Sequence, residues 1–228
     1  MKLFTIAIDG PSGVGKSTLA NKLAEELHIH HLDTGAMYRC LGLACLKAGL
    51  DPSLPEDADE VLATNNLQIA FQDNHQLNLL NGHDVSDEIR NDAVSMAAST
   101  ISKHPHVRSY LTLLQRELAK TASFVLDGRD IGTVVLPKAT VKIFLTADAK
   151  KRAERRYLEL KSKGQEIDLA TVEEDLRRRD KQDSERKVAP LCRAEDAHLI
   201  DSTNLDIEGT VKAVLDLCAK RGIQVERR

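Results

Sequence analysis

Residues 10–17 of the chain read GPSGVGKS and lie between two segments of different character. The preceding residues, 4–8, form an apolar run rich in β-formers, which is typical of a strand buried in a parallel sheet. In the following residues, Leu19 and Leu23 belong to an apolar stripe with helical spacing, which predicts a helix beginning near Lys16. A glycine-rich turn between a buried strand and a helix indicates an α/β fold, with the turn at the carboxyl edge of the sheet.

The same segment matches the motif G-x-x-x-x-G-K-[ST] in full. Its glycines allow successive backbone N–H groups to surround a phosphate, and the helix N-terminus adds partial positive charge. We expect Lys16 to reach the β- and γ-phosphates of a nucleotide, and the Ser17 hydroxyl to ligate Mg²⁺. GTPases, ATPases and small-molecule kinases all share this motif. A GTPase would also need a base-reading N-K-x-D motif, and residues 21–24 (NKLA) do not provide one.

Short apolar runs alternate with helical patterns along the rest of the chain. Further strands are predicted at residues 29–32, 124–126, 141–145 and 198–200. Helices are predicted from residue 36 to a stop at Gly49, as one long stretch over about 92–120, and at the end of the chain from about 207 to 218. The runs at 67–71 and 76–80 are separated by polar residues, which indicates an antiparallel insertion.

A strongly charged region follows the strand at 141–145. Asp148 is expected to cap a basic helix that ends at Gly164, and Thr171 and Glu174 have capping-box spacing at the start of another helix. The two helices would form a hairpin with little continuous apolar face. We therefore expect it to be mobile until phosphates bind.

Charge and cysteine content exclude several classes of function. The 32 basic and 35 acidic residues give a net charge of -3, so the chain lacks the positive charge needed for sequence-independent binding of nucleic acid. Four cysteines without a CxxC pair favour reduced thiols. We see no signal-peptide pattern and no apolar stretch long enough to cross a membrane. We expect a cytoplasmic monomer that binds neither nucleic acid nor membranes.

Three further segments combine arginine with carboxylate: LDTGAMYR (32–39), LDGRDIG (126–132) and RRRDKQDSER (177–186). The first two follow predicted strands, so their loops should lie at the same sheet edge as the phosphate loop. Arginine binds phosphate oxygens bidentately, whereas a carboxylate accepts hydrogen bonds from a ribose hydroxyl or an exocyclic amine. The segments therefore predict a second nucleotide as the acceptor. Surface ion pairing is the alternative, and it explains the third segment better than the first two, which are apolar and contain glycine.

The segments IDGPSGVGKST, LDTGAMYR, DGRDIGT and RKVAPL occur in this order and together resemble bacterial cytidylate kinases. The similarity covers nearly the whole chain. It implies an α/β fold with a five-stranded parallel P-loop sheet flanked by helices, in one domain whose core comprises about 1–59, 93–149 and 188–228. It also implies a monophosphate-binding insertion at about 60–92 and a mobile helical lid at about 150–187. The implied reaction is ATP-dependent phosphorylation of CMP and dCMP with Mg²⁺.

The resemblance also assigns residues to sites. The ATP site would comprise Gly10, Pro11, Ser12, Gly13, Val14, Gly15, Lys16, Ser17, Thr18 and, on the lid, Arg156. The CMP site would comprise Thr34, Arg39, Ser99, Arg108, Arg129, Asp130, Arg179, Asp183 and Arg186. Within it, Arg39, Arg129 and Arg186 would approach the acceptor phosphate; Ser99, Arg108 and Asp130 the cytosine; Arg179 and Asp183 the sugar. Lys16, Arg129 and Arg186 would be the catalytic residues, and Ser17 the metal ligand.

Two other functions use the same core. A kinase of another small acceptor, such as shikimate or dephospho-coenzyme A, would not need the cytosine-directed residues. A regulatory nucleotide-binding switch would hydrolyse ATP slowly and respond to a protein partner. Formation of ADP in proportion to added CMP distinguishes the cytidylate kinase from both.

Overall fold

The computed structural model describes residues 3–73, 75–162 and 164–224. It contains a five-stranded sheet in the order β2-β6-β1-β7-β8 and a three-stranded sheet in the order β3-β4-β5. Strand β7 pairs in parallel with both β1 and β8, whereas β4 pairs antiparallel with β3 and β5. The predicted α/β fold, a five-stranded parallel sheet flanked by helices with an antiparallel insertion, is confirmed. The chain divides into two compact units, Met1–His28 with Val125–Arg228, and Ile29–Phe124.

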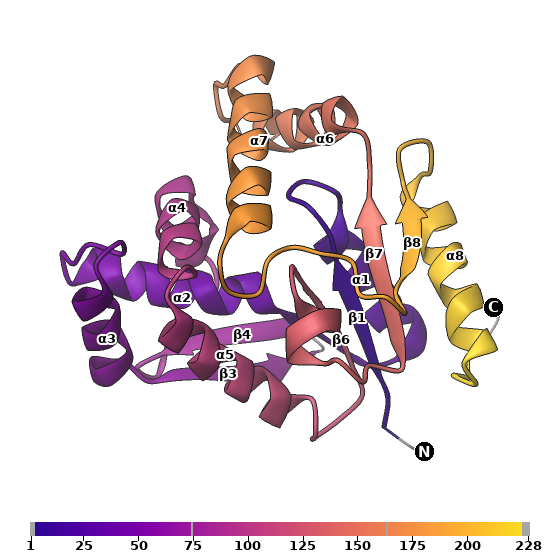
Figure 1. Cartoon of the computed structure of the whole chain (residues 1–228), viewed down its shortest axis with the longest axis horizontal. Helices are drawn as coiled ribbons and strands as arrows, with labels where there is room; N and C mark the ends of the chain where they lie inside the picture. The colour runs from indigo at the N-terminus through magenta and orange to yellow at the C-terminus, as the bar shows by residue number, and fades with distance from the viewer. Residues whose placement is uncertain (1–2, 74, 163, 225–228) are drawn as a thin grey trace. The chain divides into compact units, whose positions relative to one another are not determined.

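The first unit holds the phosphate loop. Its elements are β1 (Thr5–Asp9), α1 (Lys16–Leu27), β6 (Phe124–Gly128), a π-helical turn η2 (Ile131–Val135), β7 (Val141–Thr146), α6 (Ala149–Ser162), α7 (Leu169–Glu185), β8 (His198–Asp201) and α8 (Ile207–Lys220). Ile6 and Ile8 in β1 are fully buried, as expected for a central parallel strand. Figure 1 shows β1, β7 and β8 side by side, and α8 packs against α1 and β7.

Helices α6 and α7 form the charged hairpin. Asp148 accepts hydrogen bonds from the backbone N–H of Lys150 (2.9 Å), so the predicted cap of α6 is confirmed. The predicted start of α7 at a Thr171 capping box is wrong, because Asp168 accepts from both the N–H (2.8 Å) and the hydroxyl (2.6 Å) of Thr171 and caps the helix instead. The hairpin has a small core of its own, formed by Ala153, Leu160, Val172 and Leu176.

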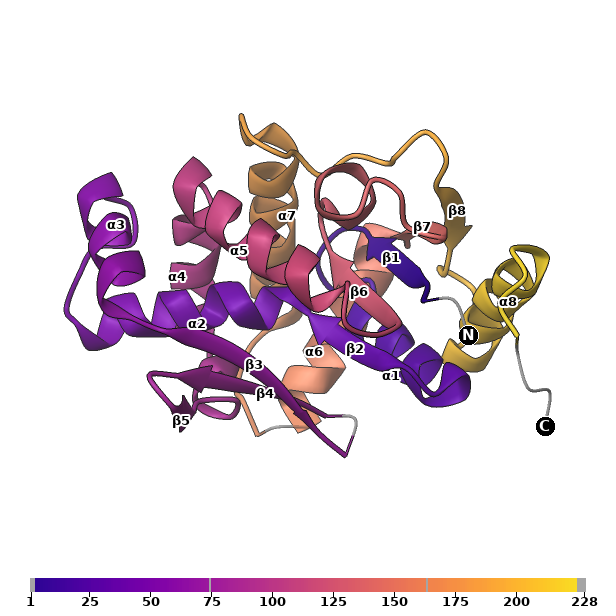
Figure 2. The same cartoon turned by 90° about the horizontal axis from the view of Figure 1, so that it is seen from below.

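The second unit contains the smaller sheet. Its elements are β2 (His30–Asp33), α2 (Thr34–Lys47), α3 (Pro55–Thr64), β3 (Leu67–Gln72), β4 (His75–Leu80), β5 (His83–Asp84), a 3₁₀ turn η1 (Glu88–Arg90), α4 (Asp92–Ile101) and α5 (Pro105–Leu118). Figure 2 shows the hairpin of β3 and β4. Asn74, in the predicted turn between these strands, lies outside the described residues.

The single long helix predicted over 92–120 is wrong. The structure has two helices, because α4 ends at Ile101 and Pro105 begins α5. Proline has no N–H to donate to an earlier carbonyl, and it is favoured in the first turn of a helix. Within the described ranges, none of the helices is both long enough and apolar enough to cross a membrane.

Candidate active site

The phosphate loop joins β1 to α1 and depends on glycine at two positions. Gly10 adopts φ +154°, and a Cβ at this position would lie 2.1 Å from the backbone oxygen of Leu145. Gly13 adopts φ +71°, and a Cβ there would lie 3.3 Å from both δ-carbons of Leu176 in α7. Both φ values strain any L side chain, and at Gly10 the clash is with the backbone of β7. The glycines of the motif therefore serve the path of the loop and the close approach of α7.

Lys16 lies in the first turn of α1 and is 6% exposed. Its Nζ donates to the backbone oxygens of Gly10 (2.9 Å) and Pro11 (2.7 Å). Burial lowers the pKa of Lys16 to about 7, and the nearby Arg129 charge acts in the same direction. The amine of this side chain therefore lies against the backbone of the phosphate loop, as the motif predicts.

Ser17 forms a pair that the sequence did not assign. Its hydroxyl donates to the carboxylate of Asp127 at 2.8 Å, and Asp127 is buried near the end of β6. Hydroxyl and carboxylate oxygens are the ligands that Mg²⁺ prefers, and Mg²⁺ commonly keeps several waters beside one or two protein ligands. The donor set therefore fits Mg²⁺. A carboxylate near the carboxyl end of a buried strand, beside the phosphate loop, was the sequence signal that could have identified Asp127.

Arg129 connects the phosphate loop with α7. Its Nη2 donates to the hydroxyl of Ser12 at 2.8 Å, and its Nε donates to the carboxylate of Asp183 at 2.6 Å. Burial acts to lower the pKa of Arg129, but the Asp183 carboxylate outweighs it and the pKa is raised. The guanidinium is therefore a fixed positive charge beside the loop.

Asp130 and Arg186 lie next to this group. Arg186 Nη2 is 3.4 Å from Asp130 Oδ1, and Arg186 Nη1 is 3.8 Å from Asp183 Oδ1. The side chains of Arg186 and Asp130 are 8% and 7% exposed. The backbone after Asp130 is held by Asp9, whose carboxylate accepts from the N–H groups of Ile131 and Gly132, both at 2.7 Å. The structure thus brings four of the predicted CMP-site residues together: Arg129, Asp130, Asp183 and Arg186.

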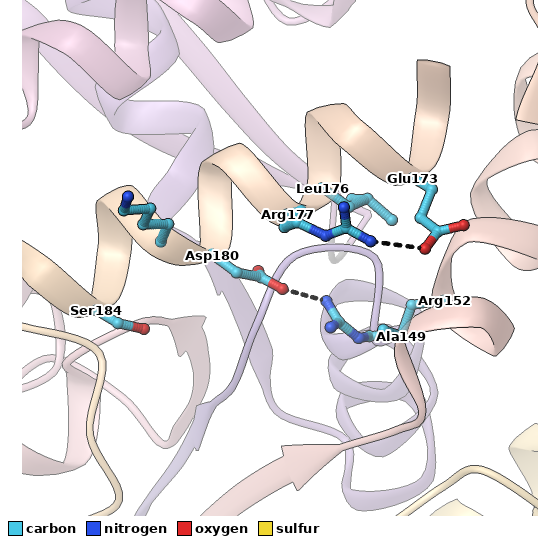
Figure 3. Close-up of a pocket in the computed structure, with 8 residues that line it drawn as sticks. Ala149, Arg152, Glu173, Leu176, Arg177, Asp180 and Ser184 are labelled. Atoms are coloured by element: carbon cyan, nitrogen blue, oxygen red, sulfur yellow. Dashed lines mark hydrogen bonds and ion pairs between the residues drawn. The ribbon is translucent and has the colours of Figure 1, made fainter. Parts of the chain in front are cut away.

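The remaining predicted lid residues lie on α6 and α7. Arg179 is half-buried on α7, and Arg156 on α6 pairs with Glu159 at 2.9 Å within the same helix. Arg152 of α6 and a face of α7 line a pocket of about 310 Å³. Figure 3 shows these lining residues. Dashed lines in the figure mark the pairs of Arg152 with Asp180 and of Arg177 with Glu173.

In the second unit, Asp33 holds two arginines. Its Oδ2 accepts from Arg39 Nη2 at 2.8 Å and from Arg90 Nη1 at 3.1 Å. Burial alone would raise the pKa of Asp33, but the guanidinium groups of Arg39 and Arg90 hold it well below its usual range. Among the described residues, the buried Nε of Arg39 has no hydrogen-bond partner. Two guanidinium groups on one carboxylate leave a surplus of positive charge. Arg90 is a residue of this cluster that the sequence did not predict.

The other predicted residues of this unit lie on α2, α4 and α5. Thr34 is buried at the start of α2, and Arg108 is 4% exposed on α5. The Arg108 guanidinium lies over the ring of Tyr38, 5.5 Å from its centre, and Arg108 Nη1 donates to the backbone oxygen of Ser102 at 3.4 Å. The Ser102 hydroxyl donates to the backbone oxygen of Ser99 at 2.8 Å. Ser99 and Arg108 are therefore linked through Ser102.

A parallel α/β sheet, a phosphate loop with its lysine, and a cluster of arginines define a P-loop phosphotransferase. The family model described as cytidylate kinase matches residues 6–220. A cytidylate kinase of Caldicellulosiruptor bescii is 49% identical over 220 residues, which cover 96% of this chain and 97% of that protein. One of Caldicellulosiruptor saccharolyticus is 50% identical with the same coverage. The chain belongs to the cytidylate kinase family, and the resemblance seen in the four sequence segments is confirmed.

The fold is also similar to that of a solved structure with little sequence similarity. An uncharacterized protein from Eubacterium ventriosum is 15% identical, with a TM-score of 0.54, and the match covers 95% of this chain and 98% of that one. At this level of identity the similarity supports the fold and does not address the acceptor.

Proposed function

We propose that this chain transfers the γ-phosphoryl group of ATP to the phosphate of CMP and dCMP. The observation that carries the proposal is the 2.8 Å hydrogen bond from Arg129 to the hydroxyl of Ser12. It holds a guanidinium, which binds phosphate bidentately, beside the loop that binds the donor phosphates. Membership of the cytidylate kinase family supports cytidine nucleotides as acceptors.

The reaction needs no general base. A phosphate monoester has a second pKa of about 6, so the acceptor phosphate is mostly dianionic at neutral pH and is itself the nucleophile. The barrier is the repulsion between two polyanions that must meet in line. Lys16, Arg129 and Arg186 are the cations that we propose hold the acceptor and the transferred group. Ser17 and Asp127 would hold Mg²⁺, whose chemistry is to neutralise charge on the donor phosphates.

We propose roles in CMP recognition for residues of each unit taken by itself. Arg39 and Arg90 would bind the acceptor phosphate, a role supported by the surplus of positive charge around Asp33 and the unpaired Nε of Arg39 among the described residues. Ser99, Arg108 and Asp130 would recognise cytosine, and Thr34 would be a further residue of the CMP site. Arg179 and Asp183 would recognise the sugar.

The organisation of the domain is part of the same proposal. Residues 60–92 would act as the monophosphate-binding insertion, residues 150–187 as a lid, and Arg156 as a lid contact to ATP. Closure of the lid would exclude water, which otherwise competes with CMP for the phosphoryl group. We also propose that the protein works as a monomer in the cytoplasm, where its free thiols, Cys40, Cys45, Cys192 and Cys218, would stay reduced.

Dependence of ADP formation on the acceptor tests the proposal. ADP release should be measured with ATP and Mg²⁺ alone, and then with CMP, dCMP, UMP, shikimate or dephospho-coenzyme A. We expect a large stimulation by CMP and dCMP, and none by shikimate or dephospho-coenzyme A. If the rate of ADP formation were the same with and without CMP, the proposed function would be wrong.

A further inference from the structure

Ser12, the third residue of the phosphate loop, has all three of its polar groups bound by side chains. Its N–H donates to Asp180 Oδ1 at 2.9 Å, and its backbone oxygen accepts from Arg152 Nη1 at 2.9 Å. Its hydroxyl accepts from Arg129 Nη2 at 2.8 Å. Two of the three partners, Arg152 and Asp180, belong to the helical hairpin and are separate from the proposed CMP site. The loop, the hairpin and Arg129 therefore meet at one residue.

The two hairpin partners are also bonded to each other. Arg152 Nη1 lies 2.6 Å from Asp180 Oδ2, and the two side chains are 10% and 21% exposed. Arg152 also donates from Nε to the backbone oxygen of Ala147 at 3.2 Å. Figure 3 shows Arg152 on α6 and Asp180 on α7 pointing toward each other. One carboxylate thus joins two helices and the backbone of the phosphate loop.

An apolar contact lies one helical turn before Asp180. Leu176 is 7% exposed, and its δ-carbons would be 3.3 Å from a Cβ at Gly13, the loop residue that follows Ser12. Leu176 and Asp180 are four positions apart, so they share one face of α7. This face therefore contacts the tip of the loop through both an apolar and a charged side chain.

Partial burial separates the Arg152–Asp180 pair from the exposed ion pairs formed between neighbouring turns of α7. The pair of Asp175 with Arg178 has a similar length, 2.8 Å, but its side chains are 43% and 57% exposed. Exposed pairs contribute little to stability, whereas loss of one partner of a buried charge pair leaves the other charge without compensation. Removing the Asp180 charge should consequently disturb Arg152 and Ser12, and removing the Asp175 charge should disturb neither.

We propose that Asp180 is a positioning residue for phosphoryl transfer, acting with Arg152 through Ser12 on Arg129. The inference rests on the proposed function, because it takes Arg129 as a cation at the acceptor phosphate. Asp180 sets the position of the Ser12 backbone, and the Ser12 hydroxyl in turn orients the Arg129 guanidinium. Asp180 itself contacts neither substrate in this proposal.

Asp180→Asn and Asp175→Asn form a matched pair of variants on one helix. In Asp180→Asn the amide NH₂ would face a donor, either the Ser12 N–H or Arg152, so one of the two contacts is lost with little change in volume. We expect kcat to fall about 10- to 100-fold, the range for a misplaced catalytic group, with KM for CMP changed by less than about threefold. ADP formed without CMP should rise as a fraction of total turnover, since a loosened hairpin admits water. Asp175→Asn should match the unchanged protein in all three quantities.

Two further measurements separate positioning from a purely structural role. Arg152→Lys keeps the charge but loses the planar guanidinium, whose Nε bonds to Ala147 while Nη1 bonds to Ser12 and Asp180, so it should show the same changes to a smaller degree. Hydrogen exchange of the Ser12 amide, followed by NMR without substrates, should speed up in Asp180→Asn and stay unchanged in Asp175→Asn.

The possible failures are distinguishable. If the unchanged protein forms no ADP in response to CMP, the proposed function fails, and this inference fails with it. The second outcome is that the unchanged protein is active, but Asp180→Asn equals Asp175→Asn both in kcat and in the fraction of ADP that is formed without CMP. The proposed function would then stand, and the inference would be overturned. A lower melting temperature of Asp180→Asn with unchanged kcat would likewise overturn it, because Asp180 would then be only structural.

Discussion

The hydroxyl of Ser17 donates to the carboxylate of Asp127 at 2.8 Å, which joins the end of the phosphate loop to the end of β6. These residues are 110 positions apart in the chain. Ser17 is exposed, whereas Asp127 is 4% exposed. The pair therefore extends from a hydroxyl at the protein surface to a buried carboxylate. In the proposed function these two residues would hold Mg²⁺.

Ser17→Ala should therefore weaken the binding of Mg²⁺, and Ser17→Thr should not, because threonine keeps the hydroxyl. We expect the Mg²⁺ concentration for half-maximal activity to rise about tenfold in Ser17→Ala, as when a metal site loses a supporting group. Titration of Mg²⁺ at saturating ATP and CMP measures this. Equal Mg²⁺ dependence of the alanine and threonine variants would remove Ser17 from the metal site.

The charge of Lys16 should make ATP capture pH-dependent. Burial lowers the pKa of Lys16 from its ordinary value of 10.5 to about 7. We expect kcat/KM for ATP to fall as pH rises above about 7, because this ratio reports the free enzyme, and kcat to fall less, because bound phosphates restore the charge. Between about 7 and 10.5 the native state binds fewer protons than the unfolded chain, so the contribution of Lys16 to the unfolding free energy rises with pH there.

Rate profiles from pH 6 to 9 test this assignment, with Lys16→Arg as the control. The guanidinium stays charged over this range, so the variant should be slower but should lack the fall above pH 7. A flat profile of kcat/KM for the unchanged protein from pH 7 to 9 would contradict the lowered pKa.

Asp9 should stabilise the first unit through the hydrogen bonds that its carboxylate accepts from two backbone N–H groups. Asp9→Asn should lower the unfolding free energy by about 1–3 kcal/mol at pH 7.5, because its NH₂ group would face one of these donors. Burial raises the pKa of Asp9 to about 6. The native state therefore binds more protons than the unfolded chain between about pH 4 and 6, and the contribution of Asp9 falls as pH rises through this window.

Urea unfolding at several pH values measures both effects. Asp216→Asn is the control, because Asp216 is 47% exposed and pairs with Lys212 on the surface of α8, where loss of the pair should cost less than about 0.5 kcal/mol. If Asp9→Asn were as stable as this control, the two 2.7 Å contacts of Asp9 would carry no net stabilisation.

Local patterns in the sequence were sufficient for most of the fold. The apolar periodicities predicted α1 and α8, and the short apolar runs predicted all five strands of the parallel sheet. Helix α3 (Pro55–Thr64) was not predicted, and the break before Pro105 was missed because the apolar spacing continues on both sides of it. Gly42 is another case, since a Cβ there would lie 2.7 Å from the backbone N of Ala98 in α4. Such close packing depends on a partner that is distant in the sequence.

The same distinction applies to the site. Motifs identified residues that lie in one short segment, such as Lys16 and Arg129. The contact of Asp180 with Ser12 spans 168 positions, and that of Arg90 with Asp33 spans 57. Asp180 lies in the charged segment 177–186 that the sequence marked, but nothing local indicates its contact with Ser12. Arg90 has no local pattern that marks it, and its role was recognised only from its contact with Asp33 in the folded chain.

The choice between cytosine and uracil tests the proposed role of Asp130. Cytosine presents an N4 amine donor beside the N3 acceptor, whereas uracil presents the O4 acceptor beside an N3–H donor. If Asp130 accepts from N4, Asp130→Asn should lower kcat/KM for CMP more than for UMP and narrow their ratio, by about 1–3 kcal/mol or roughly tenfold or more. Asp130 also lies 3.4 Å from Arg186, so some loss common to both substrates is expected. The ratio of the two kcat/KM values is therefore the quantity to measure.

Asp183→Asn is the matched comparison. It should lower kcat/KM for both substrates alike, because Asp183 is proposed at the sugar and bonds to Arg129. If Asp130→Asn also left the ratio unchanged, Asp130 would act by holding Arg186, and cytosine recognition would rest on Ser99 and Arg108.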